Sequence, residues 1–558
     1  MQKYLFPILL LLIAAPASAR TTPSNKTATR SFVPLTRQTL NQHFPGISTE
    51  GINARLRQRK WRPSQTWLRN EGRKYGRLLV FSDLHMATGR DPLTRRISPY
   101  EEFKHDQQEA DFVSLLSAQW QQSKSDRKVR SVVVNGDLFE LMQTDRTVRG
   151  ETFSGPRDRF GPSNTPEVAE AKLRAIAAGH PRFFAAIAEH IARGHRFVIV
   201  AGNHDRQIIH PHVLSSFRRM LTNSVEAHLV NAAKTDAKIN DAAQRQLSAR
   251  AKELVDEHFE LAPWFWMHGD FVARHGNEAD HSNAFSTPFA EFYHPQAKNV
   301  PMEAAFGDYV VRAFVNRPEF KQPWIDNGAR PMQQLWAVLK SIKGNPVTLL
   351  RGLGYLLTRE GVTADAATRD ADLRADISRY VKEFDLAKKF NVLRETRNKL
   401  SEAQVVDMLV AYEKQGALAI YSRFKADTGV FTRLGRLLRQ LPELIKHPSM
   451  KKCQLRMCDA LFANGVGVVA GGHDHVFRIE SRLRIAADGE TVSRADVIDT
   501  STWVDKIPAI RRETGFQTDK TRGVLVVDFD KEGGHYHLMN YDPQRGLQLV
   551  NLLEEAPK

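Results

Sequence analysis

The chain is poor in cysteine and, beyond its first residues, in long apolar runs. Only Cys453 and Cys458 occur among 558 residues. On one helix they would point to different faces, which disfavours a disulfide between them. No cysteine pair has the spacing of a zinc site, and no later segment has the apolar length of a membrane-spanning helix. These absences argue against a disulfide-stapled domain and against a cysteine-ligated zinc module.

The first residues have the layout of an export signal. In MQKYLFPILLLLIAAPASAR a lysine precedes an apolar run over residues 5–15, and the small-residue motif Ala-Ser-Ala follows. This pattern is typical of a cleavable secretory signal, with cleavage expected after Ala19. An uncleaved anchor is the alternative. We therefore expect residues 1–19 to be a signal peptide and the protein to be exported, either periplasmic or secreted.

Basic residues outnumber acidic ones. The chain has 80 Lys and Arg against 63 Asp and Glu, a formal net charge of +17. Such an excess favours anionic ligands or surroundings: phosphate groups, anionic lipid or nucleic acid. Part of it lies in residues 20–76, which we interpret as a basic N-terminal arm. Because this arm contains tryptophans but no RNA-binding signature, nucleic acid is the least expected partner.

From residue 77 onward, strand and helix patterns alternate. The segments RLLVFSD, VRSVVVNGD and HRFVIVAGNHD have strand character and are separated by helical stretches. This order predicts an α/β fold with a parallel portion of sheet, whose strands end at one edge. Strand patterns stop after residue 298 and resume with VGVVAGGHDH. We predict one α/β domain over 77–298 and 449–558, interrupted by a helical insertion over 299–448.

Polar motifs follow the predicted strands, at the point where each strand ends. They are Asp83-Leu84-His85, Gly136-Asp137, Gly202-Asn203-His204-Asp205 and Gly472-His473-Asp474-His475. Within Asp-x-His and His-x-His, alternation along a strand would put the outer side chains on one face. Their oxygen and nitrogen donors suit Mn, Fe, Zn or Mg better than copper. Each motif alone is a common loop or cap, but their order indicates one shared metal site.

A fifth motif is ambiguous because the dipeptide His-Gly occurs twice, at His268 and His275. In one extended strand they would be about 23 Å apart and on opposite faces, so one strand could not bring both to one centre. The step from Gly269 to Asp270 predicts a hairpin turn that joins PWFWMH to DFVARH. We expect His275, at the end of the returning strand, to be the ligand. His268 remains the alternative.

This ordered set of motifs resembles the metal-binding signature of the calcineurin-like metallophosphoesterase superfamily, over roughly residues 77–280 and 466–542. The resemblance implies an αβ sandwich of two sheets flanked by helices, with two divalent metal ions. One ion would be held by Asp83, His85, Asp137 and His475, and the other by Asp137, Asn203, His275 and His473. A shared anionic ligand such as Asp137 is what two cations roughly 4 Å apart require.

The same resemblance assigns catalytic roles. His204 is expected to protonate the leaving oxygen, with Asp205 holding its tautomer; a structural loop histidine is the alternative. For Glu140, at the end of the segment GDLFE, a helix cap is a sufficient interpretation. The sequence thus predicts an exported phosphoesterase that hydrolyses a phosphomonoester, phosphodiester or pyrophosphate by attack of metal-activated hydroxide.

The substrate prediction depends on the insertion. Its segments NPVTLLRGLGYLLTRE and GVFTRLGRLLRQLPELIKHP carry arginines among leucines. Such helices can lie on an anionic membrane or cover a lipid, although helices packed on one another would show the same pattern. We expect a phosphorylated small molecule or, by preference, a lipid-linked or cell-envelope phosphate. The alternatives are a metal-retaining scaffold that binds a membrane or protein partner and a nucleic-acid phosphodiesterase.

Overall fold

The computed structural model describes residues 32–34, 77–144, 164–312, 366–416, 450–503 and 522–549, with short gaps inside these ranges. The predicted signal peptide, nearly all of the basic arm and both amphipathic insertion segments lie outside the described residues. Among the helices of the described part, none combines the length and apolar character needed to cross a membrane.

A seven-stranded mixed sheet contains four adjacent parallel strands. These are β2 (Arg77–Phe81), β3 (Val129–Asn135), β4 (Arg196–Val200) and β5 (Phe259–Ala262). On the side of β2 the sheet continues as an antiparallel meander of β11 (Gly523–Asp530), β12 (Gly533–Asp542) and β13 (Gly546–Leu549). The apolar, β-branched sequences of β2 to β4 suit strands that are buried on both faces.

A six-stranded sheet packs against the first. Its order is β1 (Phe32–Pro34), β9 (Phe477–Ile485), β10 (Val492–Thr500), β8 (Val468–Gly471), β7 (Phe271–Arg274) and β6 (Phe265–His268). Strands β10, β8 and β7 are parallel, whereas β6 and β7 form an antiparallel hairpin. The turn contains Gly269 at φ 57°. The hairpin predicted from the sequence is confirmed.

Alternation along the strands builds two cores on the seven-stranded sheet. Leu78 and Val80 of β2 lie in an apolar cluster with Trp266 of the other sheet, so this cluster fills the space between the sheets. Their neighbours Leu79 and Phe81 belong to a second cluster on the opposite face. There five helices cover the sheet: α6 (His105–Gln121), α7 (Pro166–Gly179), α8 (Pro181–Ala192), α9 (Pro211–Ala233) and α10 (Asp241–His258).

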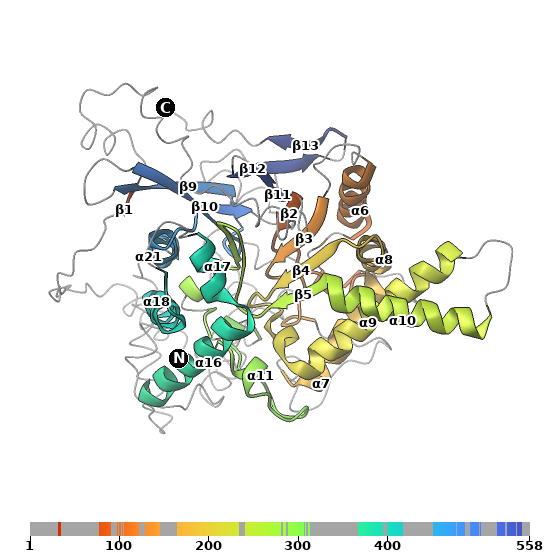
Figure 1. Cartoon of the computed structure of the whole chain (residues 1–558). Coiled ribbons are helices and arrows are strands. Elements are labelled where there is room, and N and C mark those ends of the chain that lie inside the picture. Colours follow the sequence, from red (N-terminus) through yellow and green to blue (C-terminus); the bar gives the residue numbers. More distant parts are fainter. Residues whose placement is uncertain are drawn as a thin grey trace, which may run out of the picture.

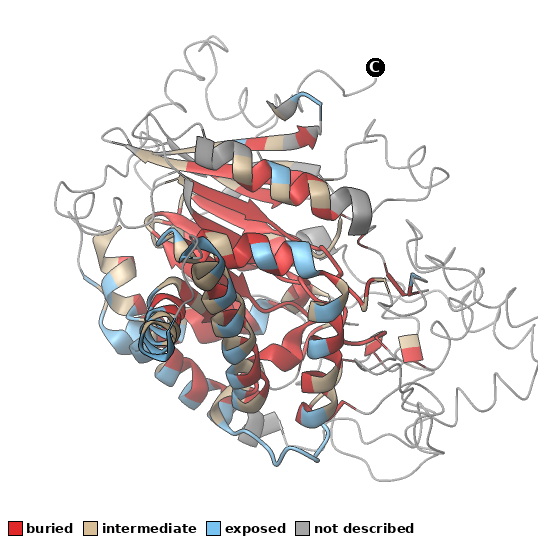
Figure 2. Cartoon of the chain, turned by 90° about the vertical axis from the view of Figure 1, so that its right-hand side faces the viewer, coloured by how far each residue is buried: buried red, intermediate tan, exposed pale blue. Residues whose placement is uncertain are grey.

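The six-stranded sheet has its own helical cover. It consists of α16 (Ala366–Glu383), α17 (Leu386–Val392), α18 (Glu402–Gln415) and α21 (Met450–Ala463). Ile377, Leu409 and Leu461 of these helices share a buried cluster with Val469 of β8. Figure 1 shows this group on one side of the strands and α6 to α10 on the other, and buried residues fill the sheets and the inner helix faces (Figure 2). The predicted α/β fold class is confirmed.

The described helices of the predicted insertion, α16 to α18, therefore form one layer of the sandwich. A fully buried tyrosine, Tyr380 of α16, donates its hydroxyl to the backbone carbonyl of Phe265 in β6 over 2.6 Å. Its ring also packs on Trp264 and Phe289. This contact connects the insertion to the hairpin that ends in His275.

Replacing this hydroxyl tests the attachment of the insertion. Tyr380→Phe should lower the free energy of unfolding by about 1 kcal/mol, because a buried hydrogen bond is lost without a change in shape. Urea unfolding measures the difference. The matched control is Tyr293→Phe, whose hydroxyl bonds Glu383 at the exposed surface and whose loss should change stability by under about 0.5 kcal/mol. Equal effects of the two variants would argue against the buried bond as an anchor.

Candidate metal centre

The predicted ligand residues follow strands that end at the same edge of the sandwich. Asp83 and His85 come after β2, Asp137 after β3 and Asn203 after β4, all in the parallel part of the seven-stranded sheet. His275 follows β7, and His473 and His475 follow β8, its parallel neighbour in the six-stranded sheet. Because the carboxyl ends of parallel strands meet at one edge, residues as far apart in the sequence as Asp83 and His475 become neighbours.

A first group of donors consists of Asp83, His85 and His475. The Nε2 atoms of His85 and His475 are 3.1 Å apart. Nε2 of His475 is also 3.2 Å from Oδ1 of Asp83. The donor atoms of all three residues lie close enough to share one metal ion.

A second group consists of Asp137, His275 and His473, with Asn203 beside it. Nε2 of His275 is 2.9 Å from Oδ2 of Asp137 and 3.1 Å from Oδ1 of Asn203. His275 is fully buried, and Asn203 and Asp137 are buried with it. These donors could hold a second ion.

Asp137 connects the two groups. Its Oδ2 atom, which faces His275, is also 3.7 Å from Nε2 of His85 in the first group. Asp137 further belongs to a third possible set, with His85 and His204. The overlap of these buried groups fits a multi-metal site, and the donor chemistry, imidazole with carboxylate and amide oxygen, suits borderline or hard divalent ions.

The backbone at the site is held in an uncommon conformation. Five of the predicted ligands have positive φ: Asp83 (55°), His85 (48°), Asp137 (52°), His473 (68°) and His475 (54°). Only two other non-glycine residues of the described part share this conformation, Asp385 and Arg522. Left-handed φ is uncommon for residues with a Cβ atom, and such strain clusters at functional sites. The strands thus end in turns that direct successive side chains into one space.

Glycines before the ligands leave room for their neighbours. A Cβ atom on Gly136, which has φ 86°, would lie 2.2 Å from Nδ1 of His275. A Cβ atom on Gly202 would lie 2.2 Å from Oδ1 of Asp137 and 2.5 Å from its backbone nitrogen. Both glycines are therefore needed for the close approach of the strand ends.

The outward nitrogens of the histidines provide a test of whether a metal fits. Nδ1 of His275 is 3.0 Å from the backbone oxygen of Asn135, and Nδ1 of His85 is 3.2 Å from Oε2 of Glu140. Nε2 of His473 is 3.1 Å from Oδ2 of Asp280. Metal-ligating histidines nearly always donate their second nitrogen to a carboxylate or carbonyl, which fixes the tautomer. The residues present fit a metal centre by this criterion.

The charges of the ligands also favour cation binding. Burial alone would raise the pKa of Asp137, but the neighbouring charges of His275 and His204 outweigh it and hold the pKa well below its usual range. The pKa of Asp83 is likewise held well below its usual range, because the charge of His475 outweighs the effect of burial. Burial lowers the pKa of His275, yet Asp137 and Asp83 more than compensate and raise it to about 10. Without metal, the ring of His275 is therefore protonated at neutral pH and itself supplies a positive charge next to Asp137.

His204 lies beside the two groups with a different partner from the one predicted. Its Nδ1 atom is 2.5 Å from Oε2 of Glu140, and one fifth of its side chain is exposed. The prediction that Asp205 holds the tautomer of His204 was wrong. Both oxygens of Asp205 accept backbone N–H groups instead, from Gly202 and Leu138, each over 2.7 Å. Asp205 thus fixes the two strand ends that carry Asn203 and Asp137.

Glu140 is a residue of the candidate site for which the sequence pattern suggested only a helix cap. It is fully buried and contacts both His85 and His204. The sequence shows that Glu140 comes three residues after Asp137. Only the folded structure shows that it contacts two histidines of the site and is not simply a helix cap. Burial alone would raise the pKa of Glu140, but the charge and hydrogen bond of His204 outweigh burial and bring this pKa down to about 2.

The two His-Gly dipeptides are separated by the hairpin. His268 is paired with Phe271 next to the turn, whereas Arg274, which precedes His275, is paired with Phe265 at the other end. The ring of His268 stacks on Trp266 with centroids 5.6 Å apart. The geometry thus brings His275, and not His268, to the other predicted ligands.

Fold and site together define an α/β protein with buried histidine and aspartate groups that could bind metal ions. In comparisons with known proteins, no family model, no curated protein and no solved structure matches the chain.

Proton release on metal binding tests the centre. His275 must lose a proton to become a ligand, so at pH 7 metal binding should release at least one proton, and affinity should fall about tenfold per pH unit as the pH drops. Calorimetry in two buffers of different ionisation enthalpy measures the proton count. His275→Ala should lose bound metal and this proton release, whereas His268→Ala should retain both. The reverse result for the two variants would identify His268 as the ligand.

Proposed function

We propose that the protein is a metal-dependent phosphoesterase with two divalent ions, held by the seven residues of the two donor groups. The observation that carries the proposal is the position of Asp137, whose one carboxylate oxygen lies near histidines of both groups. A carboxylate shared in this way is what a pair of cations requires. The order of the sequence motifs supports the same interpretation.

When bound, two such ions would neutralise charge on a phosphate group and lower the pKa of water at the site. The chain's own residues have further tasks. Asp83 and Asp137 remain ionised because of the surrounding imidazoles. Glu140 and Asp280 orient His85 and His473 through their outward nitrogens. These contacts keep the donor nitrogens turned into the site before any ligand arrives.

His204 is the proposed proton donor to the leaving oxygen. Burial opposes its charge, but the carboxylates of Glu140 and Asp137 outweigh burial and raise its pKa to about 9. At neutral pH the ring is therefore protonated. Because Nδ1–H faces Glu140, Nε2–H is left to protonate the departing alkoxide, and Glu140 stabilises the charged ring until then. One fifth of the His204 side chain is exposed, so part of the ring is accessible from solvent.

Export and a lipid-linked or cell-envelope substrate remain part of the proposal on sequence grounds. The export signal, the net charge of +17 and the amphipathic arginine-containing segments support them. A phosphomonoester, a phosphodiester and a pyrophosphate are all compatible with the arrangement of donors. Substrate comparison on the purified, metal-loaded protein decides among them.

Two substitutions separate metal binding from proton transfer. Asp137→Ala should abolish hydrolysis of chromogenic phosphomonoesters and phosphodiesters together with stoichiometric metal binding, because both groups lose their common carboxylate. His204→Gln should keep the metal and lower kcat by roughly 10²- to 10⁴-fold, the usual contribution of a general acid. Metal analysis measures the bound metal of each variant, and steady-state kinetics measures its kcat. Activity that survives chelation and Asp137→Ala would refute the proposal, and metal loss in His204→Gln would make His204 a ligand.

Glu140 should govern the alkaline limb of the pH profile. His204 must be protonated, so activity is present below its pKa and is lost as the pH rises through it. Glu140→Gln removes the carboxylate that raises this pKa, and the alkaline limb should move to lower pH by about one unit or more. The pH dependence of kcat/KM measures the shift, and metal content is determined in parallel because Glu140 also contacts His85. An unchanged limb at full metal content would contradict the pairing.

A further inference from the structure

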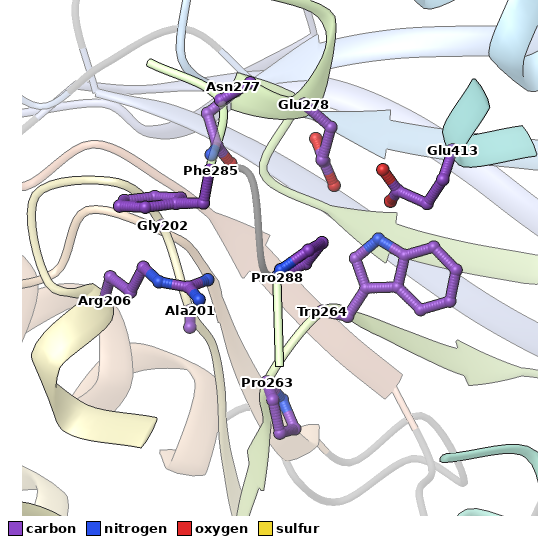
Figure 3. Close-up of a pocket in the computed structure, with 11 residues that line it drawn as sticks. Ala201, Gly202, Arg206, Pro263, Trp264, Asn277, Glu278, Phe285, Pro288 and Glu413 are labelled. Carbon is purple, nitrogen blue, oxygen red and sulfur yellow. The ribbon is translucent and has the colours of Figure 1, made fainter. Parts of the chain in front are cut away.

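A small pocket lies next to two segments that carry proposed metal ligands. Its lining includes Gly202 and Asn277, which belong to the two segments that carry Asn203 and His275. Glu278, Glu413 and Trp264 lie on one side of the pocket, and Arg206 with Phe285 on the other (Figure 3). Glu413 comes from α18, so the helical insertion contributes directly to this wall.

Most charges around the pocket are already balanced. The Arg206 guanidinium lies 2.7 Å from Glu291 and stacks 4.0 Å from the centre of the Phe285 ring. The Arg274 guanidinium lies 3.5 Å from Glu278. In the described part of the chain, the lining carboxylate without a salt bridge is that of Glu413.

Glu413 is also incompletely hydrogen-bonded. Only 2% of the residue is exposed, and its Oε1 atom has no hydrogen-bond partner in the part of the chain that the structure describes. Burial and the nearby charge of Glu278 raise its pKa to about 8, against the indole N–H of Trp264, which lowers it. An unpartnered buried oxygen is costly, and a bound cation would favour the ionised form of a group that this pKa leaves largely protonated at neutral pH.

We infer that this pocket binds the ammonium group of a phosphoester substrate whose phosphate occupies the metal centre. An organic cation is attracted both by a carboxylate such as that of Glu413 and by the face of an aromatic ring such as that of Trp264. The cavity volume of about 30 Å³ suits a primary ammonium rather than a trimethylammonium group. The inference rests on the proposed function, which it narrows to esters of an amino alcohol.

Paired ligands that differ only in the ammonium group test the pocket. The probes are O-phosphoethanolamine and ethyl phosphate, titrated calorimetrically into the metal-loaded full chain. The wild-type protein should bind phosphoethanolamine about tenfold more tightly, and Glu413→Gln should remove this preference. Glu402→Gln, the same change at an exposed position of the same helix, should keep it. Equal affinities of the wild-type protein for the two probes would overturn the inference without recourse to any variant.

Hydrolysis of bis(4-nitrophenyl) phosphate separates this inference from the proposed function. If that ester is cleaved and the two probes bind equally, the function stands and the ammonium pocket is wrong. If the probes differ as expected and no ester is cleaved, the pocket stands and the hydrolytic function is wrong. Phosphatidylethanolamine vesicles and glycerophosphoethanolamine then distinguish a lipid from a soluble source. Cleavage of either supports the substrate class, and cleavage of neither by an active enzyme contradicts it.

Discussion

The buried carboxylate of Asp137 is the constraint around which the site is arranged. A charge in this position is tolerated only because imidazoles surround it on several sides. Its other oxygen accepts the backbone N–H of His204 over 2.9 Å, so the same side chain also fixes the loop after β4. Cations are the natural counterpart of this arrangement, since in their absence protons on the histidines must supply the positive charge.

The fold makes this concentration of charge possible by bringing strand ends together. Two sheets share an apolar interior, and their parallel strands direct the following loops to one edge. Positive φ at Asp83 and Asp137 costs conformational energy that isolated loops would not bear. Here backbone contacts compensate, because the N–H groups of Leu84 and His85 both donate to the carbonyl of Asp137 over 2.9 Å. The backbone strain at Asp83 and Asp137 is thus maintained by the pairing of β2 with β3 and by the hydrogen bonds that follow it.

For identifiable reasons, the sequence was sufficient to predict the fold class and the meeting of the polar motifs at one edge of the sheets. Apolar runs ending in polar motifs predict strands, and parallel strands put their carboxyl ends together, so the meeting of Asp83, Asp137 and Asn203 followed from order alone. The choice of His275 over His268 needed one further element, the Gly269 turn. The hydrogen-bond partners of individual side chains were harder to predict from the sequence. Asp205 is adjacent to His204 in sequence but bonds backbone groups, whereas Glu140, 64 residues away, is the actual contact.

The helical insertion shows why such partners escape sequence analysis. Its pattern indicated helices, but not that α16 and α18 would cover the six-stranded sheet or that Glu413 would line a pocket together with Gly202 and Asn277. Period and composition determine which face of a helix is apolar, and the packing partner depends on the whole fold. A buried glutamate on an otherwise apolar face is unfavourable for the helix layer alone. Because Glu413 lies at the wall between the insertion and the loops that follow β4 and β7, the insertion forms part of this pocket as well as part of the core.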